Sequence, residues 1–285
     1  MANSIQMRED YLKVIDENYV QNCKTAILDG AFNYKFNEAG KFLVAQTSFD
    51  GTSTYEGKYP DGSVKLEWKE YAPNYNQATA FDIDYIANNE AGQLMLSDLV
   101  MNFEGNMVFP NLDAFRLSTY AGKAKTGNVV SEDLATAKAT ITALRNAIDK
   151  IEEAEADPMN CVCFIAPSIL NAISDMDTTA SKAVLSELGA FVKIPQKRLY
   201  TGGEFVAKKG FQPKAVESKL MNFIILDKTK LIQGNSRLFT KVFTPEENQI
   251  SDGYRVPYHR YEIADVLESG KSTIIASVST KDATV

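Results

Sequence analysis

The tetrapeptide GKST at positions 270–273 is the part of this sequence whose residues most directly suggest chemistry. A Gly-Lys-Ser/Thr ending is typical of loops that wrap nucleotide phosphates. Such a loop also needs a glycine five residues before the Gly-Lys pair, and it must follow a strand and begin a helix. Asp265 takes the place of that glycine, and the β-branched residues after Lys271 predict a strand. The sequence therefore predicts that residues 268–271 form a hairpin turn between two strands, not a nucleotide site.

His259, the single histidine of the chain, is the second candidate for chemistry. One histidine excludes metal sites that need two, and it leaves room for a single Ser-His-Asp or Cys-His arrangement. His259 lies among aromatic residues in a strand-like stretch, where a lone histidine usually has a structural role. A small-molecule enzyme that uses His259 is therefore kept only as a distant alternative.

Cys161 and Cys163 lie two residues apart in an apolar stretch, so a strand would direct both side chains to one face. A tetrahedral metal site would need a second pair of Cys or His residues, which the sequence does not supply. We therefore expect both cysteines to be core residues. No motif predicts a catalytic, cofactor-binding or metal-binding residue, so we expect a protein that is not an enzyme.

Composition and charge limit the possible classes further. The 285 residues suffice for one large domain or two smaller ones. The apolar runs are far shorter than the ~20 residues of a membrane helix, and the odd number of cysteines argues against a disulfide framework. The net charge of −7 argues against tight, sequence-specific binding to nucleic acid. We therefore expect a protein of the cytoplasm with no membrane partner.

Residues 44–85 are rich in Gly, Ser, Thr and aromatic residues and show no helical period. Val64, Leu66 and Trp68 alternate with charged residues, as in a strand. A Pro-Asp-Gly turn precedes them, so the sequence predicts a long β-hairpin or a pair of extended arms. Because an isolated hairpin is marginally stable in water, this one needs a partner surface. That surface could belong to the same domain or to a neighbouring subunit.

The remainder of the chain shows both helical and strand-like patterns, which predicts an α+β protein. A helix is expected over residues 94–122, with a kink or a break at Pro110 and a stop at Gly122. A second helix is expected to start at Ser131 and to bury an apolar stripe that ends at Ile151. Further strands are predicted at residues 161–166, 190–194, 222–226, 236–243, 254–267 and 272–278.

Four motifs occur in order along the chain: GSVKLEWKEY at 62–71, VFPNLDAFR at 108–116, VCFIAPSILN at 162–171 and FTPEENQ at 243–249. They resemble, in turn, the extended loop, the spine helix, the apical strand-Pro-helix step and the C-terminal portion of the major capsid proteins of tailed bacteriophages and prophages. These proteins share the Hong Kong 97-type capsid fold. The resemblance covers about residues 40–280.

The resemblance implies a division of the chain into structural regions. In chain order these are an N-terminal arm at 1–40, an extended β-hairpin loop at 41–88, a peripheral domain with the long spine helix at 89–130 and 251–285, and an apical domain at 131–250. The helix within residues 131–156 is placed in the apical domain, with the peripheral domain as the alternative.

The resemblance also implies a function. Copies of the chain would assemble into the pentamers and hexamers of an icosahedral phage head in the cytoplasm of a host bacterium, and would become part of the virion. The head would enclose double-stranded DNA without sequence-specific binding, and portal and scaffolding proteins would be further partners. The nearer alternative is an encapsulin-like shell protein that encloses a cargo enzyme.

Six residues are candidates for contacts between subunits: Trp68, Tyr71, Tyr75, Tyr258, Arg260 and Tyr261. The first three would anchor the extended loop on a neighbouring subunit, because aromatic residues dominate interface hot spots. The last three would make contacts of the peripheral domain. Packing within the subunit is the alternative for all six.

Overall fold

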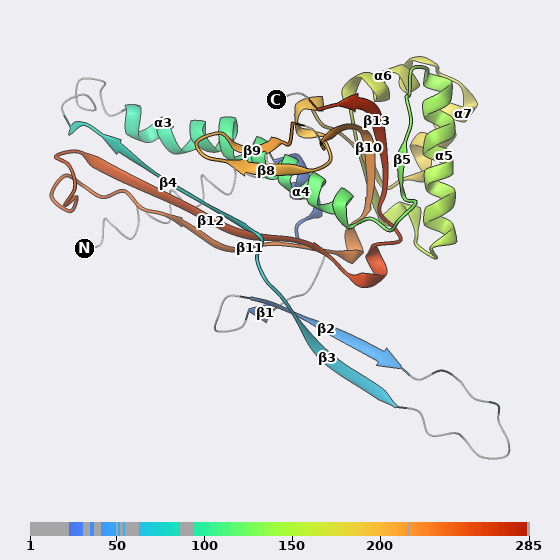
Figure 1. Ribbon diagram of the computed structural model, residues 1–285, viewed down its shortest axis with the longest axis horizontal. Coiled ribbons are helices and arrows are strands. Elements are labelled where there is room, and N and C mark those ends of the chain that lie inside the picture. The colour runs from blue at the N-terminus through green and yellow to red at the C-terminus, as the bar shows by residue number, and fades with distance from the viewer. Residues whose placement is uncertain are drawn as a thin grey trace.

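The computed structural model of the chain describes residues 23–30, 35–36, 41–49, 51, 54, 63–85, 94–215 and 217–283. It shows an elongated body of helices and sheets, from which one β-hairpin projects (Figure 1). The predicted α+β class is confirmed. Most of the predicted N-terminal arm lies outside the described residues.

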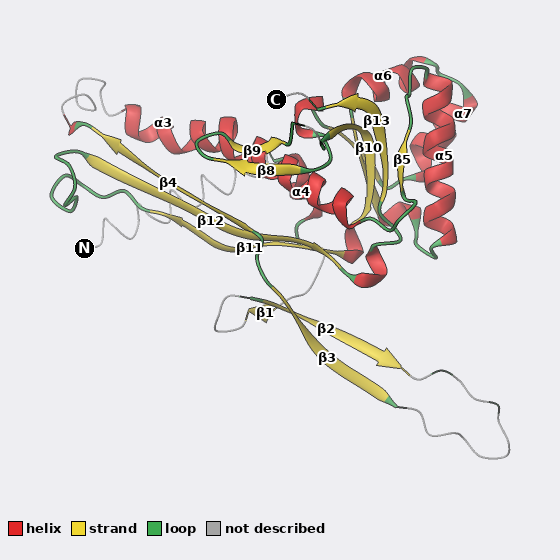
Figure 2. Ribbon diagram, viewed as in Figure 1, coloured by secondary structure: helices red, strands yellow, loops and turns green. Residues whose placement is uncertain are grey.

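The described strands form four sheets, which are yellow in Figure 2. The projecting hairpin has the order β1 (Lys35–Phe36), β2 (Phe42–Phe49) and β3 (Val64–Tyr71). A long sheet has the order β11 (Leu231–Thr240), β12 (Tyr254–Val266) and β4 (Tyr75–Ile83). A five-stranded sheet has the order β5 (Val129–Ser131), β13 (Ile275–Asp282), β10 (Lys219–Asp227), β6 (Cys161–Ile165) and β7 (Ala190–Lys193). A small hairpin pairs β8 (Gly203–Val206) with β9 (Gly210–Pro213).

The described α-helices are α3 (Leu94–Phe103), α4 (Phe109–Lys123), α5 (Ala137–Glu153), α6 (Pro167–Asp175) and α7 (Thr179–Glu187). A π-helical turn, Glu104–Val108, joins α3 to α4. Short 3-10 turns occur at Lys24–Leu28, Pro158–Asn160, Gln196–Arg198, Lys228–Lys230 and Glu268–Gly270. In Figure 1, α3 and α4 run along the long sheet, whereas α5, α6 and α7 gather beside the five-stranded sheet.

The five-stranded sheet is covered on both faces. Cys161, Cys163 and Phe223 pack on one face with α5, α6 and α7. Val162 and Phe164 pack on the other face, in the core that contains α4. Because neither face of the sheet meets water at β6 and along most of β10, these two strands contain continuous buried runs without alternation. The prediction that both cysteines are buried core residues is confirmed.

Helix α4 lies between the five-stranded sheet and the long sheet. Its residues Leu112, Leu117 and Tyr120 are fully buried, in one core with residues of β6, β10 and β12. Along β12 of the long sheet, every second side chain from Val256 to Val266 is buried, and Ile263 is buried as well. This helix is therefore the element against which both sheets are positioned.

The helical run from α3 to α4 does not break at Pro110. Pro110 lies in the first turn of α4, directly after the π turn. Proline cannot donate to the carbonyl four residues earlier, and its ring crowds that carbonyl. A π turn shifts the hydrogen-bond pattern by one residue, so the helix continues past the proline. The stop predicted at Gly122 falls one residue later, because α4 ends at Lys123.

Helix α5 begins later than the sequence predicts. Thr136 caps it, and its hydroxyl accepts from the N–H of Ala139 at 3.3 Å. Ser131 instead ends β5, which pairs in parallel with β13. Serine and threonine are both good caps, so pairing in the sheet decides which of them is used. The predicted apolar stripe up to Ile151 is confirmed, and it faces the five-stranded sheet.

Strand pairing crosses three boundaries of the predicted regions, and the division into regions stays a prediction. The prediction places β4 in the extended loop at 41–88, but β4 pairs with β12 in the long sheet. It places β11 in the apical region at 131–250, but β11 also pairs with β12. It places β13 in the peripheral segment 251–285, but β13 pairs with β10. The order of strands along the chain does not reveal which strands pair. Each of these three strands pairs with a strand that lies far away in the sequence or in another predicted region.

The segment around GKST is a crossover between sheets. Residues Glu268–Gly270 form a 3-10 turn, so the predicted turn is confirmed. The predicted closing hairpin is wrong, because β12 belongs to the long sheet and β13 to the five-stranded sheet. The residues after Lys271 lead into a strand and not a helix, which agrees with the rejection of a phosphate loop.

Gly270 packs against a second crossover, Lys228–Lys230, which joins β10 to β11. A Cβ at position 270 would lie 2.6 Å from Cβ of Lys230 and 2.9 Å from Cγ1 of Val266. Gly270→Ala is therefore expected to lower the free energy of unfolding by about 1–3 kcal/mol, measured by urea denaturation of the unassembled subunit. Gly122→Ala is the control, because a Cβ there meets no atom within 4 Å and alanine favours the helix. Equal stability of the two variants would contradict the close packing at the crossover.

Candidate functional site

The projecting hairpin has two faces of opposite character. β2 and β3 are antiparallel, so directly paired residues such as Ala45 and Trp68 point to the same face. One face carries, beyond the root, Ala45, Thr47, Phe49, Val64, Leu66 and Trp68. The opposite face carries Gln46, Ser48, Lys65, Glu67 and Lys69. We call the first set the apolar face of the hairpin.

The apolar face is uncovered in the isolated subunit. Phe49, Val64, Leu66 and Trp68 are between 46% and 72% exposed. Lys35 of β1 lies over the Trp68 ring, with Nζ 5.1 Å from the ring centroid, but it leaves the rest of the face open. Exposed apolar side chains that adjoin one another mark an interaction surface. Burial of one such side chain is worth about 1.5–3 kcal/mol.

The root of the hairpin is fixed to the body in two ways. Phe42, Val44 and Tyr71 form a small core with two isoleucines of β11 and β12. Asn74, between β3 and β4, donates its side-chain amide to the carbonyl of Ala264 at 2.8 Å and accepts from the N–H of Ala264 at 3.0 Å. The direction in which the hairpin leaves the body is therefore set by packing and by a paired hydrogen bond.

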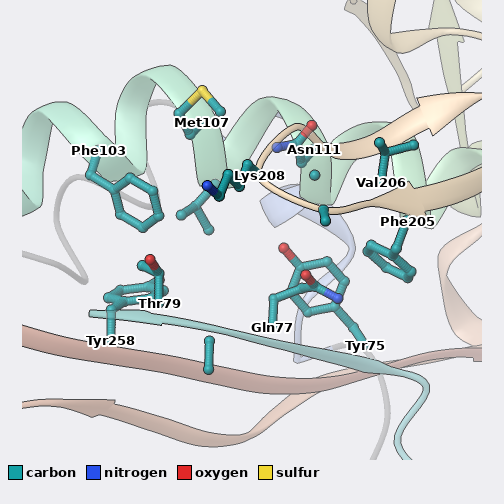
Figure 3. Close-up of a pocket in the computed structure, with 14 residues that line it drawn as sticks. Tyr75, Gln77, Thr79, Phe103, Met107, Asn111, Phe205, Val206, Lys208 and Tyr258 are labelled. Atoms are coloured by element: carbon teal, nitrogen blue, oxygen red, sulfur yellow. The ribbon is translucent and has the colours of Figure 1, made fainter. Parts of the chain in front are cut away.

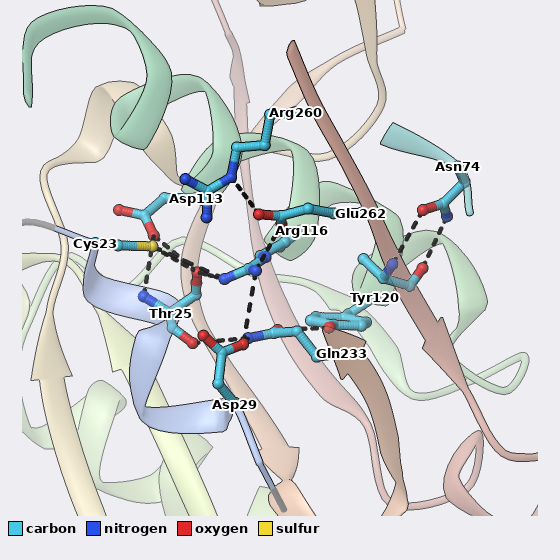
Figure 4. A network of polar contacts seen from close by, with 11 residues as sticks. Cys23, Thr25, Asp29, Asn74, Asp113, Arg116, Tyr120, Gln233, Arg260 and Glu262 are labelled. Carbon is cyan, nitrogen blue, oxygen red and sulfur yellow. Dashed lines mark hydrogen bonds and ion pairs between the residues drawn. The ribbon is translucent and has the colours of Figure 1, made fainter. Parts of the chain in front are cut away.

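A buried polar network joins the N-terminal segment to α4 and the long sheet (Figure 4). Asp113 on α4 is fully buried, and its Oδ1 accepts from the backbone N–H and the hydroxyl of Thr25, each at 2.9 Å. Its Oδ2 accepts from Arg198 at 3.1 Å. Gln233 of β11 donates to the carbonyl of Thr25 at 2.9 Å and accepts from the hydroxyl of Tyr120 at 2.6 Å. The segment is thus held by side chains that are far away in the sequence.

Arg116, one turn beyond Asp113, is the cationic centre of this network. Its guanidinium donates to the hydroxyl of Thr25 at 3.0 Å and to Oε2 of Glu262 at 2.7 Å. Arg260 binds the other oxygen of Glu262. Burial alone would raise the pKa of the Glu262 carboxyl, but the guanidinium groups of Arg260 and Arg116 outweigh it and hold the pKa below its usual value. Glu262 is therefore a buried carboxylate whose charge depends on two arginines.

A groove of about 380 Å³ opens between the helical run, β4 and the β8–β9 hairpin (Figure 3). Its lining is mainly apolar and includes Phe103, Met107 and Phe205. Gln77 and Thr79 contribute polar side chains from β4. We call this the helix–hairpin groove.

Several solved structures resemble this chain. No protein-family model matches it, and no curated protein matches it. The mature capsid of bacteriophage PhiM1 is similar with a TM-score of 0.60 and 10% identity, over 89% of this chain and 87% of that chain. The capsid of the cyanophage P-SCSP1u is similar with a TM-score of 0.57 and 11% identity, over 88% of this chain and 87% of that chain. The capsid of the Myoviridae phage XM1 is similar with a TM-score of 0.54 and 13% identity, over 90% of this chain and 91% of that chain. This chain has the phage capsid fold.

The capsid fold, predicted above as Hong Kong 97-type, is therefore confirmed, and it places four of the six predicted contact residues inside the subunit. Tyr71, Tyr75, Tyr258 and Arg260 are all 9% exposed or less. Tyr71 belongs to the root core, Tyr75 packs on α4, and the hydroxyl of Tyr258 donates to Glu104 of the π turn at 2.8 Å. Arg260 holds Glu262. These four side chains therefore pack within the subunit, which is the alternative given for them above.

Trp68 and Tyr261 remain accessible in the capsid fold, and their role at an interface stays a prediction. Tyr261 lies beside His259, whose Nε2 is 2.8 Å from Oδ1 of Asn76 on β4. His259 therefore takes part in a contact between strands. Among the residues that the structure describes, no three His, Cys, Asp or Glu side chains gather as metal ligands would. None of the described helices combines the length and the apolar character needed to span a membrane.

Among the predicted contact residues, Trp68 is the one that lies on the apolar face, and the large exposed residues Phe49, Val64 and Leu66 of this face were missed. The alternation of Val64 and Leu66 with charged residues was the signal for two of them, because it puts both on the face of Trp68. Phe49 joins this face only through its pairing with Val64, which no local pattern predicts.

Proposed function

We propose that this chain is the major capsid protein of a tailed phage or prophage, a structural protein and not an enzyme. Its copies associate into pentamers and hexamers, and these close into an icosahedral head that encloses double-stranded DNA. Portal and scaffolding proteins take part in assembly in the host cytoplasm, and the chain becomes part of the virion.

The observation that carries this proposal is the uncovered apolar face of the hairpin on a subunit with the phage capsid fold. Among the residues that the structure describes, the hairpin packs against the body through its root, and the apolar side chains of its outer half are exposed. A two-stranded hairpin in this state is marginally stable, and a partner surface stabilises it. In a closed shell, a second copy of the chain is the partner that every subunit meets.

The fixed root supports the same proposal. An element that is already ordered loses less conformational entropy when it binds. The root core and the paired bonds between Asn74 and Ala264 orient the hairpin before any partner arrives. Each copy can therefore present its apolar face in the same direction, as repeated contacts in a symmetric shell require.

The charge of the chain supports enclosure of DNA without tight binding. The sequence has 37 acidic and 30 basic residues. A wall that bound DNA tightly would neutralise phosphates with clustered Lys and Arg, and its affinity would fall steeply with salt. An acidic subunit leaves the packaged DNA unattached.

Electron microscopy of the purified full-length chain tests the proposal. We expect closed shells, together with rings of five or six subunits as intermediates. Mass photometry over a range of protein concentrations should show loss of the 31.5 kDa monomer as shells appear. A chain that stays monomeric at every concentration contradicts the proposal, whereas shells that carry one cargo enzyme and no DNA favour the encapsulin-like alternative.

A further inference from the structure

We propose that the helix–hairpin groove receives Trp68 from a second copy of this chain. This inference rests on the proposed capsid function and names the surface on which the projecting hairpin docks. Each subunit would then carry both an exposed aromatic residue and the groove that accepts it.

The apolar walls of the groove suit an indole ring. Phe205 and Met107 line it and remain 40% and 39% exposed, so both offer free surface. Phe205 already contacts Tyr75 and Phe115, with ring centroids 5.6 Å and 5.5 Å apart, and these contacts hold its ring in place. An incoming ring would extend this aromatic cluster and would also contact the thioether of Met107, both of which are favourable.

The size of the groove suits one large side chain. Its volume of about 380 Å³ lies at the small end of the range found for pockets that hold small molecules, so it has room for an indole ring. The β8–β9 hairpin forms one wall, held close to α4 at Gly210, where a Cβ would lie 2.1 Å from Nδ2 of Asn111. The groove is therefore already formed in the free subunit, and docking needs no opening step.

Polar atoms in the groove match the N–H group of an indole. Gln77, Thr79 and Asn111 line the groove and carry amide or hydroxyl oxygens that accept hydrogen bonds (Figure 3). A tryptophan that becomes buried usually finds an acceptor for its Nε1–H. A wholly apolar groove would accept leucine or phenylalanine as readily, so these oxygens favour tryptophan.

Trp68 cannot reach the groove of its own subunit. β3 leads to the root from outside, and β4 leads away from the root along the body, so the two strands lie on opposite sides of it (Figure 1). The eight residues from Trp68 to Tyr75 are largely extended and span on the order of 20 Å. Donor and acceptor surfaces are therefore different parts of the subunit. Repeated contacts of this heterologous kind form rings when the rotation closes.

Disulfide formation between two copies tests the inference. Chains with Trp68→Cys are mixed with chains that carry Thr79→Cys, assembled, oxidised and separated on non-reducing gels. We expect covalent dimers, because the two introduced thiols meet in the groove. The native thiols of Cys23, Cys161 and Cys163 are buried and should not interfere, since burial raises the pKa of Cys23 and of Cys161 to about 12.

A matched control uses Thr142→Cys, which replaces an exposed threonine of α5 far from the groove residues. Its mixture with Trp68→Cys should give no dimers above background. Fluorescence of the unmodified chain gives a second measurement, because Trp68 is its only tryptophan. Assembly should shift the emission to shorter wavelengths and reduce quenching by acrylamide.

The outcomes separate the two proposals. Intact shells that yield no dimers between positions 68 and 79, or equal dimers with the control, overturn the inference and leave the capsid function standing. Shells in which Trp68 stays open to acrylamide overturn it as well. An unmodified chain that forms no shells overturns both.

Discussion

Replacing both Leu66 and Trp68 with serine is expected to abolish shell assembly and to leave the subunit folded. Both side chains are largely exposed in the isolated subunit, so their loss removes little from its core. In the shell each would be buried, and losing both costs roughly 3–6 kcal/mol per contact, at about 1.5–3 kcal/mol for each side chain. The contact would weaken roughly 10²- to 10⁴-fold, and this loss repeats at every subunit.

Electron microscopy and size-exclusion chromatography measure assembly of this double variant, and thermal melting followed by circular dichroism measures its fold. The matched control replaces Lys65 and Glu67 with serine, on the opposite face of the same strand. These two side chains form an exposed ion pair, which contributes about 1 kcal/mol or less. The control should form normal shells. Normal shells from the Leu66 and Trp68 variant, or loss of shells from both variants, would refute the role of the apolar face.

Arg116→Met is expected to destabilise the subunit itself by about 3–5 kcal/mol. Arg116 and Glu262 are both nearly inaccessible to water, and Nη2 of Arg116 lies 2.7 Å from Oε2 of Glu262. Removal of Arg116 leaves the buried Glu262 carboxylate with Arg260 as its remaining ion-pair partner, and loss of one member of a buried charge network is costly. The variant also removes the bond to Thr25, so the N-terminal segment loses part of its anchorage. Urea denaturation, carried out with Leu66→Ser and Trp68→Ser present to prevent assembly, measures the loss.

Arg255→Met on the same strand as Glu262 is the matched control for this measurement. Arg255 pairs with Asp82 at 3.3 Å near the surface, where an ion pair is worth about 1 kcal/mol or less. Its replacement should therefore change the free energy of unfolding far less than Arg116→Met does. If the two substitutions cost the same, the buried network does not contribute to stability as argued above.

Much of the fold could be predicted because local patterns report burial. The run from Cys161 to Ile165 lacks alternation because both faces of its sheet are covered, and this made it recognisable as a strand. The alternation of Val64, Leu66 and Trp68 likewise predicted a strand with two different faces. Local patterns do not show which strands pair with each other. The turn at Glu268–Gly270 was therefore predicted correctly, whereas the predicted pairing of the two strands that flank it was wrong.

The contact residues were harder to predict than the fold. Tyr71 and Tyr75 are aromatic and lie close to Trp68 in the sequence, as expected of interface anchors, but the long sheet and α4 cover them. Arg260 and Glu262 would ordinarily indicate a solvent-facing side of β12, and instead they neutralise each other in the interior. The network depends on bonds such as that between Thr25 and Gln233, 208 residues apart, and no local signal reports such a bond.

The two crossovers between the sheets, Lys228–Lys230 and Glu268–Gly270, run side by side at one corner of the subunit. The N–H of Leu267 donates to the carbonyl of Lys230 at 3.0 Å, so the two links are bonded to each other. Twisting the two sheets against each other at this corner must therefore break the bond between Leu267 and Lys230.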